Sequence, residues 1–381
     1  MRFERVVTPS ALFLVAFLVV LLPFERSEWN VTGTANVLTG FLTTVAIYSI
    51  FVLALNVQWG YTGVFNFGVA AFFMVGAYTA AIFTKPPSDT EFVQYVGGFG
   101  DFFSPEFLDG EEWLRFLVGT AAAGAASGTL AFLLSIPTLR LREDYLAIAT
   151  IGVAELLRRV SIEERGLVNG TNGLVGIPRP LGGWFDPGDY KYVLLVIAII
   201  VMILLFLAVE RGIRSPWGRV LRALKADETV VAASGKNVFA FKMQGFVLGA
   251  FMMGIGGAMF GYQFGAVAPD NFDHFFGTFL FWAMLIIGGS GNNWGALAGA
   301  FFVWGIWNIA LQLNGYREVP GLGIDVPDAL RIRIFFIRDF LIGSMLVLIL
   351  LLRPQGMISE ERRVSMWLDR RLRRAKPPPA S

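Results

Sequence analysis

The sequence predicts an all-α, polytopic membrane helix bundle, and three observations support this fold class. Of the 381 residues, 55% are hydrophobic and 16% are charged, whereas a soluble domain has about 25% charged residues. The mean hydropathy is +0.61. The apolar residues form continuous runs suited to helices that cross the bilayer, not the alternating pattern of a membrane β-barrel. These features exclude an ordinary soluble enzyme and a disordered chain, and the absence of cysteine excludes thiolate zinc sites and cysteine nucleophiles.

Ten apolar runs are expected to cross the membrane. They are residues 8–23, 36–57, 65–84, 113–137, 144–160, 190–209, 243–266, 275–290, 295–312 and 335–352. The first, fifth and eighth runs are short enough to be tilted or re-entrant. The first run follows Arg2 and Arg5, as in a secretory signal peptide, but no pair of small residues suited to cleavage follows it. We therefore interpret it as a retained helix.

The distribution of lysine and arginine orients the bundle, because cytoplasmic loops are enriched in both. Residues 210–242 hold seven basic and three acidic side chains, and the region from Arg353 onward holds eight basic ones. Residues 85–112 have the opposite balance, with one lysine against seven acidic residues. Ten crossings with both termini in the cytoplasm put the two basic regions inside and the acidic region 85–112 outside. We expect a membrane domain at 1–358 and a basic cytoplasmic tail at 359–381, for which an amphipathic helix on the membrane and a solvated segment are the two alternatives.

Several kinds of chemistry are absent from the sequence. No phosphate-binding Gly-x-x-x-x-Gly-Lys-[Ser/Thr] motif is present, and the glycine-rich stretch 288–295 lacks the lysine, so we interpret it as a tight turn or a membrane-buried break. The single histidine, His274, is expected to be solvated in an outer loop. No metal, cofactor or catalytic residue is predicted, and a net charge of +2 gives no nucleic-acid footprint. If transport is active, its energy must come from another polypeptide.

Small residues four positions apart predict close helix packing. The pairs are Gly124 with Gly128, Gly257 with Gly261, and Gly295 with Gly299. Ionisable residues inside the runs are few. Glu155 precedes Arg158 and Arg159 by three and four positions, so these side chains are expected to pair on one helix face.

The basic stretch 214–237 predicts a helix, a break and a second helix. Ser215 and Pro216 suit a helix start, with serine as the cap, and Gly235 suits the end of the second helix. Val220, Leu221 and Leu224 form an apolar edge, while Arg219, Arg222 and Lys225 are expected to face water. This pattern fits a docking surface for a soluble partner, and it fits equally a basic loop that only fixes topology.

Several collinear segments resemble the membrane permease subunits of ABC importers for branched-chain amino acids, a family that also includes urea and short-amide permeases. The resembling segments are 65–78, 145–158, 171–178, 215–237, 288–295 and 353–356. Val69 stands where this family commonly has histidine, so any role of that imidazole is absent here.

The resemblance implies a passive permease in the plasma (inner) membrane of a prokaryote. Its partners would be a related second permease subunit, two ATP-binding subunits and an external solute-binding protein, within the lipid bilayer. The implied ATPase-coupling residues are Arg214, Ser215, Pro216, Gly218, Arg219, Arg222, Lys225, Asp227, Glu228, Ala232, Ala233, Gly235 and Asn237. Residues proposed to line the substrate path are Asn66, Gly68, Tyr78, Glu155, Thr171 and Asn172.

The coupling segment departs from the general ABC-importer pattern of a glutamate followed by two alanines, although Ala232 and Ala233 keep the small pair. Two alternatives to a branched-chain amino acid importer stay open. One is a urea or short-amide permease of the same family, and the other is a stand-alone channel or ion-coupled carrier. The residues do not decide which solute moves.

Overall fold

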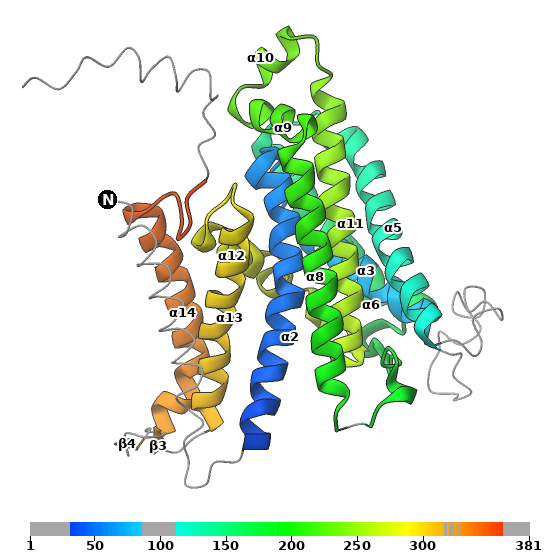
Figure 1. Ribbon diagram of the computed structural model, residues 1–381, viewed down its shortest axis with the longest axis vertical. Coiled ribbons are helices and arrows are strands. Elements are labelled where there is room, and N and C mark those ends of the chain that lie inside the picture. Colours follow the sequence, from blue (N-terminus) through cyan, green and yellow to red (C-terminus); the bar gives the residue numbers. More distant parts are fainter. Residues whose placement is uncertain are drawn as a thin grey trace, which may run out of the picture.

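The computed structural model describes residues 31–85, 112–186, 188–315, 318–319, 324–325 and 328–360, and they form a helical bundle (Figure 1). The α-helices are α2 (Val31–Leu55), α3 (Val69–Thr84), α5 (Glu112–Thr138), α6 (Glu143–Glu163), α7 (Arg165–Val168), α8 (Tyr190–Arg214), α9 (Pro216–Ala226), α10 (Glu228–Ala233), α11 (Val238–Phe264), α12 (Leu280–Gly288), α13 (Asn293–Gly315) and α14 (Asp328–Leu352). The long helices run along one common direction, with α9 and α10 together at one end.

Short elements connect these helices. Two π-helical turns, η2 (Asn56–Tyr61) and η7 (Phe275–Phe279), extend α2 and precede α12. The 3-10 turns are η4 (Gly170–Asn172), η5 (Gly182–Trp184) and η6 (Pro269–Phe272). Strand β1 (Leu174–Val175) pairs antiparallel with β2 (Ala266–Val267), with Leu174 opposite Val267, and β3 (Glu318–Val319) pairs antiparallel with β4 (Ile324–Asp325).

Nine of the ten predicted runs lie on these helices, and the run 8–23 lies outside the described residues. Among the described residues, five helices are long and apolar enough to cross a membrane, namely Ala35–Tyr61, Trp113–Thr138, Tyr190–Arg214, Val238–Phe264 and Arg333–Leu352. The predicted helical membrane bundle is therefore confirmed. The number of ten crossings and the cytoplasmic location of both termini stay predictions.

The predicted run 65–84 is helical only from Val69 onward. The preceding residues are held in a non-helical conformation in which the Asn66 side chain accepts a hydrogen bond from the Gly68 N–H at 2.8 Å. A hydrogen bond between a side chain and the backbone two residues on competes with helix formation. Helix α3 is therefore shorter than a full crossing.

Glycines let the central helices approach closely, as the small-residue spacing predicts. Helix α11 packs against α3 and α5. A Cβ atom on Gly257 would lie 2.4 Å from the Phe73 carbonyl oxygen, and one on Gly124 would lie 2.8 Å from the Phe251 ring. Close backbone contact is the main source of helix association in lipid, where apolar burial gives little driving force.

The stretch 288–295 forms the predicted tight turn between α12 and α13. Gly289 and Gly291 have φ angles of +114° and +81°, which L side chains rarely adopt. A Cβ on Gly288 would lie 2.0 Å from the Gly295 carbonyl oxygen. The turn brings the start of α13 against the end of α2, close to α9.

Candidate functional site

The loop between α8 and α11 forms a helix, a break and a second helix at one end of the bundle (Figure 1). Helix α9 begins at Pro216, immediately after α8, and α10 follows a break at Asp227. The predicted arrangement is therefore confirmed. We refer to residues 214–237 as the α9–α10 loop.

The ends of these helices agree with the sequence in part. Ser215 is the residue before α9, but its hydroxyl donates to the Gly212 carbonyl oxygen at 2.6 Å and does not cap the helix. The predicted serine cap is wrong because this hydroxyl is already engaged by the end of α8. Gly235, at φ +77°, ends the second helix as predicted. Asn237 then caps α11 by accepting the Ala240 N–H at 3.1 Å.

Asp227 is the N-cap of α10. Its carboxylate accepts the Thr229 hydroxyl at 2.6 Å and the backbone N–H groups of Thr229 and Val230 at 2.8 and 3.3 Å. These hydrogen bonds favour the ionised form, so they lower the pKa of Asp227 below 3.8. Glu228 forms an ion pair with Lys242 of α11, which ties the second helix to the bundle.

The inner side of α9 packs on the end of α8. Leu221 and Leu224 are buried, as their apolar spacing predicts. A Cβ on Gly218 would lie 2.2 Å from the Ile213 carbonyl oxygen, so only glycine allows this approach. Arg222 donates to the same carbonyl at 3.3 Å. Arg222 is half-buried, so it faces water only in part.

Lys225 also points inward, contrary to the expectation that it faces water. Its Nζ donates to the Gly60 carbonyl oxygen in η2 at 2.7 Å and lies 3.4 Å from a Glu360 carboxylate oxygen. The side chain is 28% exposed. The contact exists because the π-helical end of α2 presents a carbonyl group directly beside α9. Arg219 is exposed, as predicted.

The outer side of the α9–α10 loop is open to solvent. Ala232, Ala233 and Val230 are exposed and present a small apolar surface. Arg214 is also exposed and pairs with Glu210 one turn earlier, at 2.5 Å. The loop thus combines an open face with an inner face bound to the end of α2.

A buried polar junction around Asn293 lies beside this contact. The Asn293 side-chain oxygen accepts hydrogen bonds from Asn56 Nδ2 and from the Tyr61 hydroxyl, each at 3.0 Å. Its amide nitrogen donates to Glu210 at 2.8 Å. Asn56 in turn accepts the Gly291 N–H at 2.8 Å. The junction joins the ends of α2 and α8 to the start of α13.

Asn66 stabilises the non-helical segment before α3. Its side chain donates to Gln58 at 2.8 Å and accepts from Gly68, and its backbone oxygen accepts the Trp282 indole N–H at 2.9 Å. Asn66 is fully buried. In this conformation Asn66 stabilises the non-helical segment through these hydrogen bonds, and its side chain does not face open space.

The same segment contacts α6. The Phe67 N–H donates to the Thr150 hydroxyl at 3.1 Å, and a Cβ on Gly68 would lie 2.6 Å from the Thr150 carbonyl oxygen. The Trp282 ring stacks on Phe67 and Phe65, with centroids 4.6 and 5.7 Å apart. A layer of aromatic rings therefore lies beside the first half of α6.

The other predicted path residues also gather around α6. Tyr78 is buried, with its ring centroid 5.7 Å from that of Phe272 in η6, an element that packs on α6. Thr171 and Asn172 are exposed in η4, which also packs on α6. Glu155 lies on α6 itself. One helix thus brings together the predicted residues, although they are far apart in the sequence.

Glu155 is the centre of a charged cluster. The predicted pairs are present, since Arg159 lies 2.8 Å and Arg158 lies 3.6 Å from its carboxylate. His274 Nε2 lies 3.2 Å from the same carboxylate, and Arg158 is 3.6 Å from Asp270. His274 is therefore bound to α6 and not simply solvated as expected. The loop after α11 folds back onto α6, which creates this contact.

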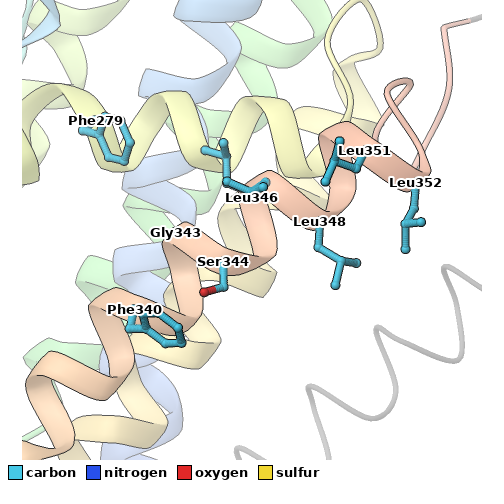
Figure 2. Close-up of a pocket in the computed structure, with 9 residues that line it drawn as sticks. Phe279, Phe340, Gly343, Ser344, Leu346, Leu348, Leu351 and Leu352 are labelled. Atoms are coloured by element: carbon cyan, nitrogen blue, oxygen red, sulfur yellow. The ribbon is translucent and has the colours of Figure 1, made fainter.

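A groove of about 800 Å³ lies along α14 (Figure 2). Its lining is Phe279, Phe340, Gly343, Ser344, Leu346, Val347, Leu348, Leu351 and Leu352. Ser344 is the one polar side chain among these residues. This surface suits acyl chains and offers no groups for a charged or strongly polar solute. Within the described ranges, no three His, Asp or Glu side chains are placed to hold a metal ion.

Residues 37–350 match the protein family described as branched-chain amino acid transport system, permease component. This match spans most of the chain. The chain belongs to this family of membrane permeases.

Three curated relatives give the same result. The chain is 28% identical to the high-affinity branched-chain amino acid transport system permease protein LivM of Escherichia coli K12 over 371 residues, which cover 91% of this chain and 74% of the relative. It is 27% identical to the LivM protein of Salmonella typhimurium over the same shares. A probable LivM permease of Methanocaldococcus jannaschii is 26% identical over 86% of this chain and 94% of its own length. No solved structure matches the chain.

The sequence did not reveal several residues that join these sites. Asn293 lies in a glycine-rich stretch whose sequence predicts a turn and no particular contact. The signal that could have revealed its role is a polar amide next to an apolar run, because such a side chain needs a buried hydrogen-bond partner. His274 and Trp282 carry no local signal, because their partners are distant in the chain. Only the packing of the helices therefore reveals the buried junction around Asn293 and the contact of His274 with α6.

Proposed function

We propose that this permease forms the translocation path of an ABC importer for branched-chain amino acids. Its partners would be a related second permease, two ATP-binding subunits and an external solute-binding protein. Family membership supports the role, and the names of the relatives, which specify branched-chain amino acid transport, support the solute class. ATP hydrolysis belongs to the partner subunits.

The proposed orientation puts the α9–α10 end in the cytoplasm of a prokaryote. The excess of lysine and arginine in residues 210–242 supports this choice. The contact between Glu360 and Lys225 supports it further, because it brings residue 360 to the same end of the bundle. The tail from 361 onward, including the proposed amphipathic helix, lies outside the described residues.

The observation on which the proposal rests most is the two-sided α9–α10 loop. Its outer face, with Ala232 and Ala233, is open for an ATP-binding subunit. Its inner face bonds to the end of α2 through Lys225 and Gly60. A shift of the loop on nucleotide binding would therefore displace η2 and the buried junction around Asn293, as rigid elements move together across a packed interface.

Helix α6 is the proposed contact with the second permease and one wall of the path. Ile148 is 66% exposed and Leu156 is 61% exposed, and Glu155 and Arg159 lie on the same side of the helix. Charged groups are costly in hydrocarbon and usually face a bundle interior or an aqueous cavity. A second subunit opposite this face would enclose such a cavity.

Copurification tests the proposal. The chain is expressed with candidate partner subunits, and leucine uptake is measured in proteoliposomes with ATP and a loaded binding protein. ATP-dependent leucine accumulation is expected. The variant Ala233→Trp should prevent association with the ATP-binding subunits, while Ala125→Trp, at an exposed position on α5, should not.

Other outcomes separate the alternatives. Uptake of urea or a short amide in place of leucine would assign the chain to that branch of the family. Uphill transport by the chain alone without nucleotide would show an ion-coupled carrier and would overturn the importer proposal. Downhill flux alone would indicate a channel.

A further inference from the structure

We infer that the open face of α6 binds the migrating solute, with Glu155 contacting the ammonium group and Arg159 contacting the carboxylate of an aliphatic α-amino acid. The inference rests on the proposed function and names the groups that would recognise its substrate class.

Helical spacing places the relevant residues in one stripe. Ile148, Gly152, Glu155 and Arg159 follow each other at intervals of four, three and four positions, so their side chains lie on the same side of α6. The opposite side is buried through Leu146, Thr150 and Ala154. The stripe therefore faces away from this chain's bundle, toward the cavity that the second permease is proposed to enclose.

The two charged groups of the stripe are both accessible in part. The Arg159 side chain is 72% exposed, and within the described residues only its Nε is engaged, by Glu155. Glu155 is 31% exposed, and its carboxylate also contacts Arg158 at 3.6 Å and His274 at 3.2 Å, so a solute ammonium group would share this carboxylate with them. Arg158 differs, because it is used in holding α6 to the η6 turn through Asp270 and the Pro269 carbonyl oxygen.

This arrangement is complementary to a zwitterion. An α-amino acid carries a carboxylate and an ammonium group on one carbon, and a guanidinium beside a carboxylate offers one partner for each. Both new contacts are charge-assisted, which favours them over contacts to a neutral solute. Urea and short amides lack both charges, so the same pair would bind them poorly.

Gly152 provides room for the side chain of the solute. No atom lies within 4 Å of a Cβ built on this glycine. It precedes Glu155 by three residues, a rise of about 4.5 Å along the helix axis. The aliphatic part of a bound leucine fits over Gly152 and against Ile148, which is 66% exposed. The stripe thus offers charged groups at one end and an apolar surface at the other, and the distance between them matches the length of one bound amino acid.

The absence of cysteine from the chain allows a direct test. Gly152→Cys introduces the single thiol into a sequence without cysteine, and the open space around Gly152 accommodates the new side chain without a clash. In the assembled importer, the rate of alkylation by a membrane-impermeant maleimide is measured with and without leucine. At a leucine concentration about ten times its Kd, the rate should fall about tenfold, because it scales with the unoccupied fraction 1/(1 + [L]/Kd).

Matched controls give the test its specificity. Gly166→Cys in α7 is also open, with no atom within 4 Å of its Cβ, and its alkylation should not respond to leucine. Adding Glu155→Gln or Arg159→Gln to Gly152→Cys should remove the protection, which is measured for each variant as the ratio of its own alkylation rates with and without leucine. Glu163→Gln on the same helix should retain the protection. Leucinamide, which lacks the carboxylate, and urea should not protect.

The result that overturns the inference is an importer that transports leucine while the Gly152→Cys thiol is not protected by it. Protection by urea equal to that by leucine would also overturn it. Failure of the proposed function is distinguishable, because in that case the chain does not associate with ATP-binding subunits or does not accumulate leucine at all.

Discussion

Replacing Lys225 by methionine removes the bond between α9 and the end of α2 while keeping the length and apolar stem of the side chain. The lost interactions are the 2.7 Å hydrogen bond to the Gly60 carbonyl oxygen and the 3.4 Å ion pair with Glu360. A hydrogen bond from a charged donor contributes about 1.5–3 kcal/mol. The side chain is 28% exposed, so solvent screening reduces this value, and the half-exposed ion pair adds about 0.2–1 kcal/mol.

A net loss of about 1–2 kcal/mol corresponds to a factor of about 5–30 in an equilibrium. If this contact transmits movement of the loop, the number of leucine molecules transported per ATP hydrolysed should fall by a factor in this range. Association with the ATP-binding subunits should not change, because Lys225 faces inward and the proposed docking face is on the other side of the loop. The measurement is the ratio of leucine uptake to phosphate release in proteoliposomes.

Lys236→Met is the matched control, since Lys236 is exposed on the same loop and its removal takes away the same charge. Its transport ratio should equal that of the unmodified protein. The reasoning is refuted if Lys225→Met keeps the full ratio, or if Lys236→Met lowers it equally. The second result would mean that only the net charge of the loop matters.

Three further predictions concern stability and local structure. Gly76→Ala puts a Cβ 2.3 Å from the Gly254 carbonyl oxygen, and overpacking of this kind costs about 1–3 kcal/mol. The melting temperature in detergent should therefore fall. Gly343→Ala is the control, because no atom lies within 4 Å of its Cβ, and it should not lower the melting temperature. Asn293→Leu removes the acceptor of the Asn56 amide and of the Tyr61 hydroxyl, at about 1–3 kcal/mol each, so trypsin should cut the α9–α10 end faster than in the unmodified protein. Equal rates would contradict the role of the junction. Asp227→Ala should speed amide exchange in α10 without affecting α9. The pKa of Asp227 is lowered from 3.8 in the folded protein, so the ionised cap stabilises α10 fully at pH values above 3.8. This stabilisation is lost as the pH falls through the lowered pKa of the folded protein. Amide exchange in α10 that does not change at low pH would exclude the cap.

Local signals predicted much of the α9–α10 loop. Pro216 marks the start of α9 and Gly235 marks the end of α10, because helix starts and positive φ angles depend on neighbouring residues alone. A break between the two helices was expected, and the structure places it at Asp227. The direction in which Lys225 points was not predictable in this way. A basic residue on an amphipathic helix normally faces water, and the Gly60 carbonyl that reverses this preference is 165 residues away.

The candidate path shows the same division. Glu155 pairs with Arg158 and Arg159 at helical spacing, which the sequence predicts correctly. The contact of Glu155 with His274 depends on the return of the loop after α11. Asn66 was expected to line the path by virtue of its polarity, yet the non-helical segment before α3 uses its side chain for internal hydrogen bonds.

The amino-acid sequence by itself determined the membrane class, the positions of the helices and the glycine contacts between them. Hydropathy, charge asymmetry and small-residue spacing are properties of short segments, and the bilayer acts on each segment separately. Only the tertiary structure decided which polar groups meet. The Asn56–Asn293 hydrogen bond joins residues 237 positions apart, and such a pair forms only after the helices have packed.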